Sequence, residues 1–324
     1  MIRGLVIGKF YPPHRGHKFL IDSAASQVDK LFIIICQRPG EQPHGELRAS
    51  WLREIHPYAD VLMVDDEGFD PDDSSLWGKL TRRWLGFTPD VVFTSENYGD
   101  AFARCLGCKH LSIDKARRTV PISGSQIRAR PLEHWEYLET CVRSYYAKRI
   151  CIVGAESTGK TTLAERLATH YQTTWVREYG REVSEQMLAV SGTYRWQSAD
   201  FVEIANTQCR LEDEAARTSN RLVICDTDAF ATSIWHLRYM GHRSAEVEAV
   251  SDTHRKPDLY LLSDCHAPFV QDGTRDGESV REWMHETFLK ELTAQQRRFT
   301  MLCGSYADRY RQAVDAIDLL LKSQ

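Results

Sequence analysis

Short apolar runs alternate with amphipathic stretches along this chain. In the first half, the runs expected as strands are Gly4–Gly8, Leu31–Cys36, Val61–Val64, Val91–Thr94 and His110–Ile113. Between the first two, the apolar residues Phe19, Leu20, Ala24 and Val28 recur at helical spacing. Strand-length apolar runs that alternate with helices predict an α/β fold, in which a parallel sheet carries helices on both faces.

The same alternation begins again near residue 149. The expected strands of the second half are Arg149–Gly154, Trp175–Glu178, Leu222–Asp226, Leu259–Ser263 and Phe299–Cys303, and Tyr306–Leu321 is expected as the last helix. A length of 324 residues also suits two domains of ordinary size. We therefore expect two α/β domains, each with a parallel sheet, spanning residues 1–146 and 147–324.

Composition and charge exclude several classes of protein. With 42% hydrophobic and 27% charged residues the chain is an ordinary globular protein, and a net charge of −4 gives no reason to expect nucleic-acid binding. The longest apolar runs are far shorter than the roughly 20 residues of a membrane span, and the chain opens on a strand pattern, not a signal peptide. A cytoplasmic location is expected, and the sequence leaves a homo-oligomer open.

Nine cysteines are present, several of them inside apolar runs, which indicates reduced, buried thiols. Cys105 and Cys108 form a lone CxxC. Because no second ligand pair follows at a suitable spacing, packing is favoured over a metal or redox site.

The second half opens with a complete phosphate-loop motif. The sequence GAESTGKT from Gly154 satisfies G-x4-G-K-[ST] between an apolar run and a helical stretch. Backbone N–H groups of such a loop cradle phosphates, a lysine reaches the β- and γ-phosphates, and a hydroxyl ligates Mg²⁺. The expected ATP-binding residues are Gly154, Glu156, Ser157, Thr158, Gly159, Lys160, Thr161 and Thr162.

Acidic and basic residues near the other strand ends complete a kinase pattern. Asp226 and Asp228 end the run RLVICDTD and are expected, with Thr161, to hold Mg²⁺, although a strand-end turn or a helix cap would also explain them. Arg275 and Arg281 lie in a Gly/Asp-rich stretch, where small-molecule kinases carry a lid, or they are surface charge. Glu178 follows the second strand as a candidate base for a substrate hydroxyl, a ribose ligand or a helix cap. No guanine-reading NKxD motif occurs, so a kinase is favoured over a GTPase.

The opening stretch GKFYPPHRGH, Gly8 to His17, raises a different possibility. It lies at the carboxyl end of the first expected strand, where open parallel sheets bind ligands. Together with ISGSQIR, Ile122 to Arg128, it resembles the (T/H)xGH and ISxSxIR signatures of the nucleotidylyltransferase superfamily, which has a Rossmann-like fold. The resemblance implies that Lys9, His14, His17 and Arg128 stabilise charge during adenylyl transfer from ATP. It also implies that Gly8, Phe10, Ser123 and Ser125 bind the nucleotide.

A nucleotidylyltransferase domain followed by a P-loop kinase domain resembles the bifunctional NadR family over essentially the whole chain. The resemblance implies two ATP- and Mg²⁺-dependent activities. The second domain would phosphorylate nicotinamide riboside to nicotinamide mononucleotide (NMN), and the first would join NMN to AMP, giving NAD and pyrophosphate. By position, Trp84 would stack on the nicotinamide, and Glu96, Tyr98, Gly99 and Arg117 would lie near the nucleotide. Some members carry an N-terminal helix-turn-helix domain; here the first strand begins at Arg3 or Gly4, so no direct DNA binding is expected.

Two alternatives stay open at this stage. The first domain could adenylylate another phosphate monoester, such as phosphopantetheine or FMN. The chain could instead be a sensor that binds NAD and ATP, with a weak or vestigial adenylyltransferase site. Product analysis with each candidate substrate and turnover measurements for each half would separate these alternatives.

Overall fold

The chain forms two compact units, Met1–Val142 and Arg143–Gln324, in a computed structural model that describes residues 1–265 and 280–322. The division between the units falls within helix α6 (Thr140–Tyr146), four residues before the expected boundary at 146/147. Each unit is built on its own sheet.

The first unit is an open parallel sheet of five strands in the order β3-β2-β1-β4-β5. In chain order its elements are β1 (Arg3–Gly8), α1 (Arg15–Ala25), β2 (Lys30–Gln37), α2 (Gly45–Ile55), β3 (Asp60–Asp65), α3 (Ser74–Leu85), β4 (Val91–Thr94), α4 (Gly99–Leu106), β5 (Lys109–Ser112), α5 (Gly124–Ala129) and a 3-10 turn at Trp135–Tyr137. The chain proceeds from β1 to β2 and β3 and returns to β4 on the other side of β1. The carboxyl ends of β1 and β4 therefore flank the crevice where such sheets bind ligands.

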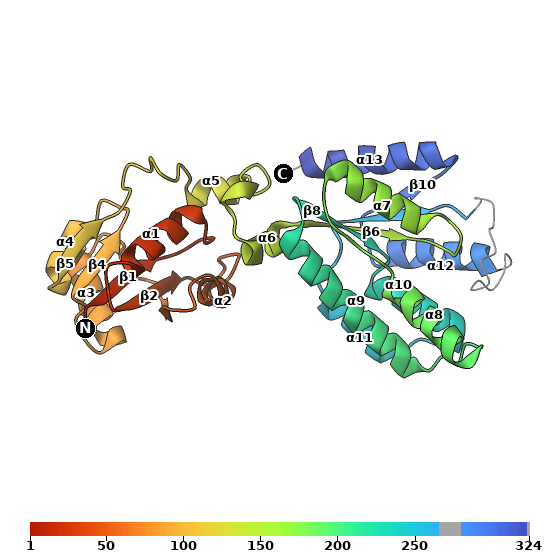
Figure 1. Cartoon of the computed structure of the whole chain (residues 1–324), viewed down its shortest axis with the longest axis horizontal. Coiled ribbons are helices and arrows are strands. Elements are labelled where there is room, and N and C mark those ends of the chain that lie inside the picture. Colours follow the sequence, from red (N-terminus) through yellow and green to blue (C-terminus); the bar gives the residue numbers. More distant parts are fainter. Residues whose placement is uncertain (266–279, 323–324) are drawn as a thin grey trace. The chain divides into compact units, whose positions relative to one another are not determined.

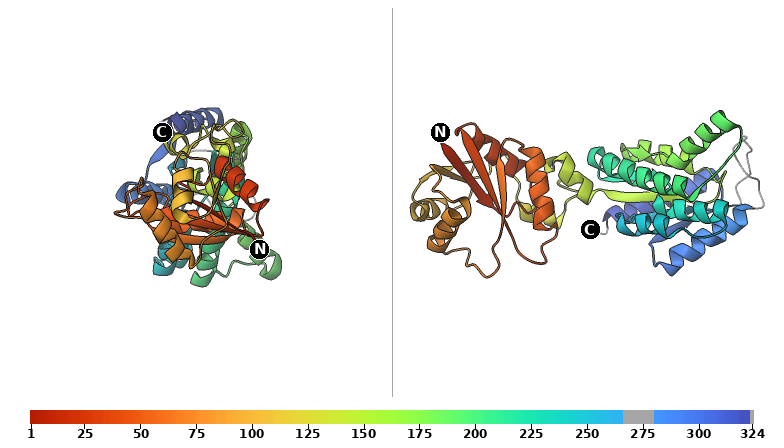
Figure 2. Two further views of the ribbon diagram at one scale, coloured as in Figure 1. Left: turned by 90° about the vertical axis from the view of Figure 1, so that its left-hand side faces the viewer. Right: turned by 90° about the horizontal axis from the view of Figure 1, so that it is seen from below.

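Side chains that alternate along these strands form a core on each face of the sheet. Val6 and Ile33 pack with α1 and α2 on one face, whereas Leu5 and Ile34 pack with α3 and α4 on the other. The right-hand view of Figure 2 shows the strands running between helices on both sides. The expected α/β fold is thus confirmed in this unit.

The second unit repeats this architecture with the strand order β10-β9-β6-β8-β7, again all parallel. Its elements are β6 (Lys148–Val153), α7 (Lys160–Tyr171), β7 (Trp175–Val176), α8 (Tyr179–Ser191), α9 (Ser198–Thr218), β8 (Leu222–Asp226), α10 (Ala229–Met240), α11 (Ala245–Thr253), β9 (Leu259–Ser263), α12 (Arg281–Ala294), β10 (Phe299–Leu302) and α13 (Tyr306–Lys322). Helices α7 and α13 cover one face of the sheet, and α9 to α12 lie on the other side (Figure 1). The central strand, β6, leads into the phosphate loop.

Two differences from the expected elements concern a strand end and a loop. β7 stops at Val176, two residues early, because Glu178 already begins the turn into α8. The Gly/Asp-rich stretch expected to include Arg281 ends before that residue, since α12 begins at Arg281. No described helix is long and apolar enough to cross a membrane.

Candidate functional site

The two histidines of the opening motif lie at the junction of β1 and α1. His14 is the N-cap of α1, and its Nδ1 accepts hydrogen bonds from the backbone N–H of Gly16 at 3.1 Å and of His17 at 3.4 Å. The two imidazole rings stack with their centroids 3.7 Å apart. A Cβ atom on Gly16 would lie 2.9 Å from the His14 ring, so the glycine between the histidines is a steric requirement.

Burial keeps both histidines neutral. It lowers the pKa of His14 to about 4, with a smaller contribution from the positive charge of Arg117. The pKa of His17 is also well below its usual value, through burial and then through the charges of His14 and Arg117. Because Nδ1 of His14 already accepts backbone hydrogen bonds, the neutral ring carries its proton on Nε2. His14 is therefore a neutral hydrogen-bond donor at pH 7.

At pH 6 we expect His14 to be neutral and in the Nε2–H tautomer, because its pKa of about 4 lies two units lower. Nitrogen-15 NMR of protein labelled in the imidazole rings measures both properties, and the signal is assigned by comparison with His14→Gln. The other histidines of the same sample serve as the reference. An imidazolium signal from His14 at pH 6 would contradict this description of the site.

The second signature, ISGSQIR, comes together with the first. Ser123 caps α5 in a capping box with Gln126. Arg128 donates to the carbonyl oxygen of Tyr11 and, at 3.2 Å, to the Ser125 hydroxyl, and its guanidinium lies 4.4 Å from the centroid of the Tyr11 ring. Two segments separated by more than a hundred residues are therefore joined at the carboxyl end of β1.

These segments line a cavity of about 740 Å³, which is the size of a typical ligand pocket. The predicted site residues in its wall are Gly8, Lys9, Phe10, His14, His17, Glu96, Tyr98, Arg117, Ser123, Ser125 and Arg128. Glu96 and Arg117 form an ion pair at 2.8 Å, and the Tyr98 hydroxyl donates to the Ile7 carbonyl at 3.3 Å. The cavity is thus lined by phosphate-binding groups and by polar groups from β4 and the segment that follows β5.

Two residues expected at this cavity do not line it. Trp84 packs beside Trp77, with ring centroids 6.0 Å apart, against the core on the α3–α4 face, and Trp77 lines the cavity instead. Gly99 begins α4, where a Cβ atom would lie 2.2 Å from Nε2 of His110, so it is a packing glycine. The cavity wall thus differs from the expected one at these two positions.

The phosphate loop of the second unit connects β6 with α7, as its motif predicts. Gly154 has a φ of +143°, and a Cβ there would lie 3.0 Å from the Ser263 carbonyl of β9. Lys160 is buried, and its ammonium donates to the Ala155 carbonyl at 2.9 Å. Arg309 of α13 donates to the Thr158 carbonyl at 2.6 Å, which holds the loop from the opposite side.

Thr161, Asp226 and Glu178 lie close to Lys160. The Thr161 hydroxyl donates to Asp226 at 2.5 Å, and the other carboxylate oxygen of Asp226 is buried with no hydrogen-bond partner in the described part of the chain. Burial raises the pKa of both Asp226 and Glu178, while the charge of Lys160 opposes the rise. A hydroxyl beside a carboxylate oxygen without a partner fits Mg²⁺, which prefers hard oxygen ligands. Within residues 1–265 and 280–322, no group of three or more His, Cys, Asp or Glu residues has the arrangement of a metal site, so Thr161 and Asp226 would supply only part of the Mg²⁺ coordination.

The remaining kinase residues differ from the expectation. Asp228 caps α10 by accepting from the Ala231 N–H at 2.8 Å, and it also accepts from the Tyr260 hydroxyl at 2.6 Å. Its carboxylate is thereby committed to the helix start, and the structure does not bring it to Thr161 and Asp226. Arg281 is a buried residue in the first turn of α12, not a loop arginine. Arg275 lies outside the described residues.

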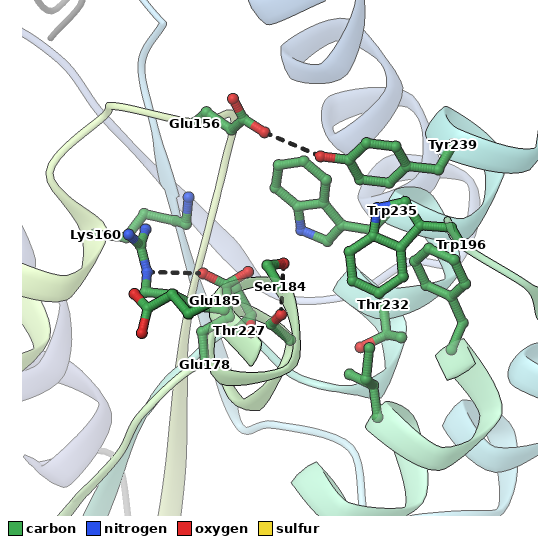
Figure 3. A pocket seen from close by; sticks show the side chains of 14 residues that line it. Glu156, Lys160, Glu178, Ser184, Glu185, Trp196, Thr227, Thr232, Trp235 and Tyr239 are labelled. Carbon is green, nitrogen blue, oxygen red and sulfur yellow. Dashed lines mark hydrogen bonds and ion pairs between the residues drawn. The ribbon is translucent and has the colours of Figure 1, made fainter. Parts of the chain in front are cut away.

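Beside the phosphate loop is a second pocket with two unlike walls (Figure 3). One wall carries Lys160, Glu178 and Glu185, and the other carries the rings of Trp196, Trp235 and Tyr239. The Tyr239 hydroxyl donates to Glu156 across the pocket at 3.4 Å. The Trp196 and Trp235 indole N–H groups are buried and find no hydrogen-bond partner among the described residues. The pocket can therefore take a flat ring with a polar substituent next to the phosphate loop.

Comparison with known proteins supports the fold inferred for each of the two units. Residues 5–130 match the Cytidylyltransferase-like family, and residues 149–309 match the AAA domain family. The chain is 32% identical to the Trifunctional NAD biosynthesis/regulator protein NadR of Escherichia coli (strain K12), over 89% of this chain and 75% of that protein. Identity and coverage are the same for the protein of that name from Salmonella typhimurium (strain LT2). This chain belongs to the NadR family.

Solved structures of NadR proteins have the same fold. One in complex with NR has a TM-score of 0.82 at 21% identity and covers 99% of this chain and 96% of that one. Another, in complex with NAD and AMP-PNP, has a TM-score of 0.79 at 22% identity and covers 100% of this chain and 97% of that one. The order of domains inferred from the two motifs is therefore that of the family.

Several residues of these sites are not identified by the motifs. They are Trp77 in the first unit and Ser184, Glu185, Trp196, Phe201, Trp235 and Tyr239 in the second. Trp235 and Tyr239 have the i, i+4 spacing of neighbours on one helix face, which was the available signal. Trp196, in the loop before α9, joins them only through tertiary packing, with its ring centroid 5.5 Å from that of Tyr239.

Proposed function

We propose that this NadR family member catalyses two consecutive steps of NAD biosynthesis. The second unit phosphorylates nicotinamide riboside with ATP to give NMN. The first unit transfers the AMP moiety of a second ATP to NMN, giving NAD and pyrophosphate.

The observation that carries the proposal is the two-walled pocket beside the phosphate loop. The nicotinamide of the riboside is a flat pyridinium cation, and Trp196, Trp235 and Tyr239 offer it aromatic faces. More acidic than basic side chains border the pocket, so a positively charged ring brings the sum of charges there closer to zero. The acidic residues are Glu156, Glu178 and Glu185, and the basic ones are Lys160 and Arg181. The carboxamide oxygen can accept from a buried indole N–H that otherwise has no partner in the described part of the chain.

For the kinase step, the loop Gly154–Thr162 and the first turn of α7 bind the triphosphate of ATP. Mg²⁺, when bound by Thr161 and Asp226, neutralises charge on the phosphate oxygens. Glu178 lies where it can accept the proton of the riboside 5′-hydroxyl, and its raised pKa makes it a stronger base than an exposed carboxylate. The hydroxyl oxygen bonds to the γ-phosphorus, the bond from that phosphorus to the β-bridging oxygen breaks, and ADP leaves.

For the adenylyl step, the phosphate of NMN attacks the α-phosphorus of ATP and pyrophosphate leaves. The attacking oxygen is already an anion, so no general base is required. His14 donates a hydrogen bond as a neutral imidazole, His17 stacks on its ring, and Lys9 and Arg128 supply positive charge. Such chemistry depends on positioning and charge stabilisation more than on covalent intermediates.

Incubation of the protein with nicotinamide riboside, ATP and Mg²⁺ tests both steps at once. Chromatography over time should show NMN first and NAD later, and NMN supplied directly should give NAD without a lag. Uridine, a neutral nucleoside, should be a poor substrate because it lacks the cationic ring. Micromolar binding of NAD and ATP without turnover would favour a sensor, and faster transfer to FMN or phosphopantetheine than to NMN would reassign the first unit.

A further inference from the structure

Arg48 is a fully buried arginine in a helix that otherwise packs as an ordinary amphipathic element. It lies on α2, beside the core residues Ala49 and Leu52, with no exposed surface. A buried guanidinium is costly unless charged and polar partners surround it. Its partners therefore indicate what it is retained for.

Those partners are backbone groups at the ligand-binding edge of the sheet. Arg48 donates through Nη1 to the carbonyl of Lys9, just after β1, and to the carbonyl of Cys36 in β2 at 3.3 Å. Its Nη2 donates to Glu41 at 2.6 Å. Lys9, Cys36 and Glu41 all line the 740 Å³ cavity. One side chain thus connects the ends of two neighbouring strands and the loop that follows β2.

Glu41 connects Arg48 to the ammonium group of Lys9, because it accepts hydrogen bonds from both side chains. Its second carboxylate oxygen accepts from Lys9 Nζ at 2.7 Å, and the first also accepts from the Arg38 N–H at 3.3 Å. Partial burial acts to raise the pKa of Glu41, but these hydrogen bonds and the charge of Arg48 lower it, so the carboxylate stays ionised. Lys9 is therefore held at both ends, by its carbonyl and by its ammonium.

The Tyr11 ring lies between Arg48 and Arg128, and so connects this cluster to the ISGSQIR signature. The Arg48 guanidinium lies 5.0 Å from the centroid of the Tyr11 ring, and the Arg128 guanidinium lies 4.4 Å from it. Tyr11 is also joined to the loop after β2, because the Gln42 N–H donates to its hydroxyl at 2.9 Å. Arg48 is hence the buried centre of a cluster formed by Lys9, Tyr11, Glu41 and Arg128.

We propose that Arg48 is a positioning residue for adenylyl transfer, acting with Glu41 through Lys9. It sets the backbone from Lys9 to Tyr11 and keeps the Lys9 ammonium at the cavity wall, from which an ATP phosphate can draw it away from Glu41. Once Lys9 has moved to the phosphate, Arg48 remains as the counter-ion of Glu41, so no carboxylate is left unpaired beside the anionic substrate. This inference rests on the proposed adenylyltransferase function of the first unit.

The test is a double-mutant cycle of Arg48→Met and Lys9→Met, measured on kcat and KM of NAD formation from NMN and ATP. We expect Arg48→Met to lower kcat by roughly 100-fold, as for a misplaced catalytic group, with a change in KM for ATP of less than about threefold. Because both residues act through one ammonium group, the double variant should be little slower than the slower single variant. Arg48→Lys, which keeps the charge but not the fork, should retain an intermediate rate.

Arg53→Met is the matched control, since Arg53 is an exposed arginine on the same helix. It should leave kcat unchanged. Phosphorylation of nicotinamide riboside by the second unit reports on the integrity of each preparation. Should Arg48→Met fail to fold, Glu41→Gln takes its place in the cycle, with an expected loss of about tenfold and the same non-additivity with Lys9→Met.

Two results would overturn the inference: a kcat for folded Arg48→Met within twofold of wild type, or a double variant slowed by the full product of the single effects. A wild-type protein that makes no NAD from NMN would overturn the proposed function itself. The two failures are therefore distinguishable.

Discussion

Replacing Lys160 with alanine is expected to abolish phosphorylation of nicotinamide riboside and to leave adenylylation of NMN at its wild-type rate. Lys160 lies in the first turn of α7, and its ammonium rests on the Ala155 carbonyl, a neutral acceptor. A triphosphate offers a charged acceptor, which forms the stronger hydrogen bond. Loss of one positioned neutral donor lowers kcat by roughly 10²–10³-fold in other enzymes. Lys160→Ala removes a full positive charge beside the transferred phosphate, so kcat of the kinase step should fall by at least that factor.

The measurement is release of ADP with nicotinamide riboside, alongside formation of NAD from supplied NMN in the same preparation. Lys256→Ala is the matched control, because Lys256 is an exposed lysine of the same unit outside the pocket. Lys160→Arg keeps the charge on a larger, planar head and should recover only part of the rate. If Lys160→Ala lost both activities while still folded, the assignment of one activity to each unit would be wrong.

The sheets and the two phosphate-binding motifs could be predicted from the sequence because their signals are local. A strand buried on both faces is an apolar run, as in Leu222–Asp226 and Leu259–Ser263, and both ranges agree with the structure. Gly154 and Gly16 stand where a Cβ would meet neighbouring atoms, so the glycines of each motif report local geometry. Loops after parallel strands meet at one edge of the sheet, which brings GKFYPPHRGH and ISGSQIR to one cavity.

That Trp77 lines the cavity, where Trp84 was expected, has a simple geometric reason. The two residues lie seven apart on α3, hence on nearly the same face but about 10 Å apart along the helix axis. A helix between parallel strands runs antiparallel to them, so its first turns lie at the carboxyl ends of the strands, where the cavity is. Trp77 is in the first turn and Trp84 near the last. Position within the helix was the signal that distinguishes them.

The role of Asp228 and the aromatic wall of the second pocket could not be predicted from the sequence, because both depend on contacts between residues far apart in the chain. An aspartate just before a helix can be a metal ligand or an N-cap, and only the contacts with Ala231 and Tyr260 decide for the cap. Trp196 lies in the loop before α9 and Trp235 lies on α10, and nothing in the sequence near either one predicts their approach. The sites were predictable where sequence motifs mark the segments that build them, and not where unmarked side chains meet only through tertiary packing.

Replacing His17 with alanine is expected to have the opposite effect to Lys160→Ala, abolishing NAD formation from NMN and sparing the kinase. His17 lines the first cavity and stacks on His14, so the substitution removes one ring and frees the other. The expected loss is roughly 10²–10³-fold in kcat, or about 2.7–4 kcal/mol of transition-state stabilisation. His134→Ala is the control, because His134 lies in the same unit but outside the cavity wall.

Mixing the two variants makes the test stricter. Neither His17→Ala nor Lys160→Ala should convert nicotinamide riboside to NAD alone, because each lacks one of the two consecutive steps. A mixture should recover conversion, since NMN released by the intact kinase of the first variant can enter the intact adenylyltransferase site of the second. The recovered rate should rise with NMN concentration. With labelled nicotinamide riboside as the substrate, an excess of added unlabelled NMN should dilute the label that reaches NAD. Label in NAD that resists this dilution would contradict transfer of free NMN between two independent sites.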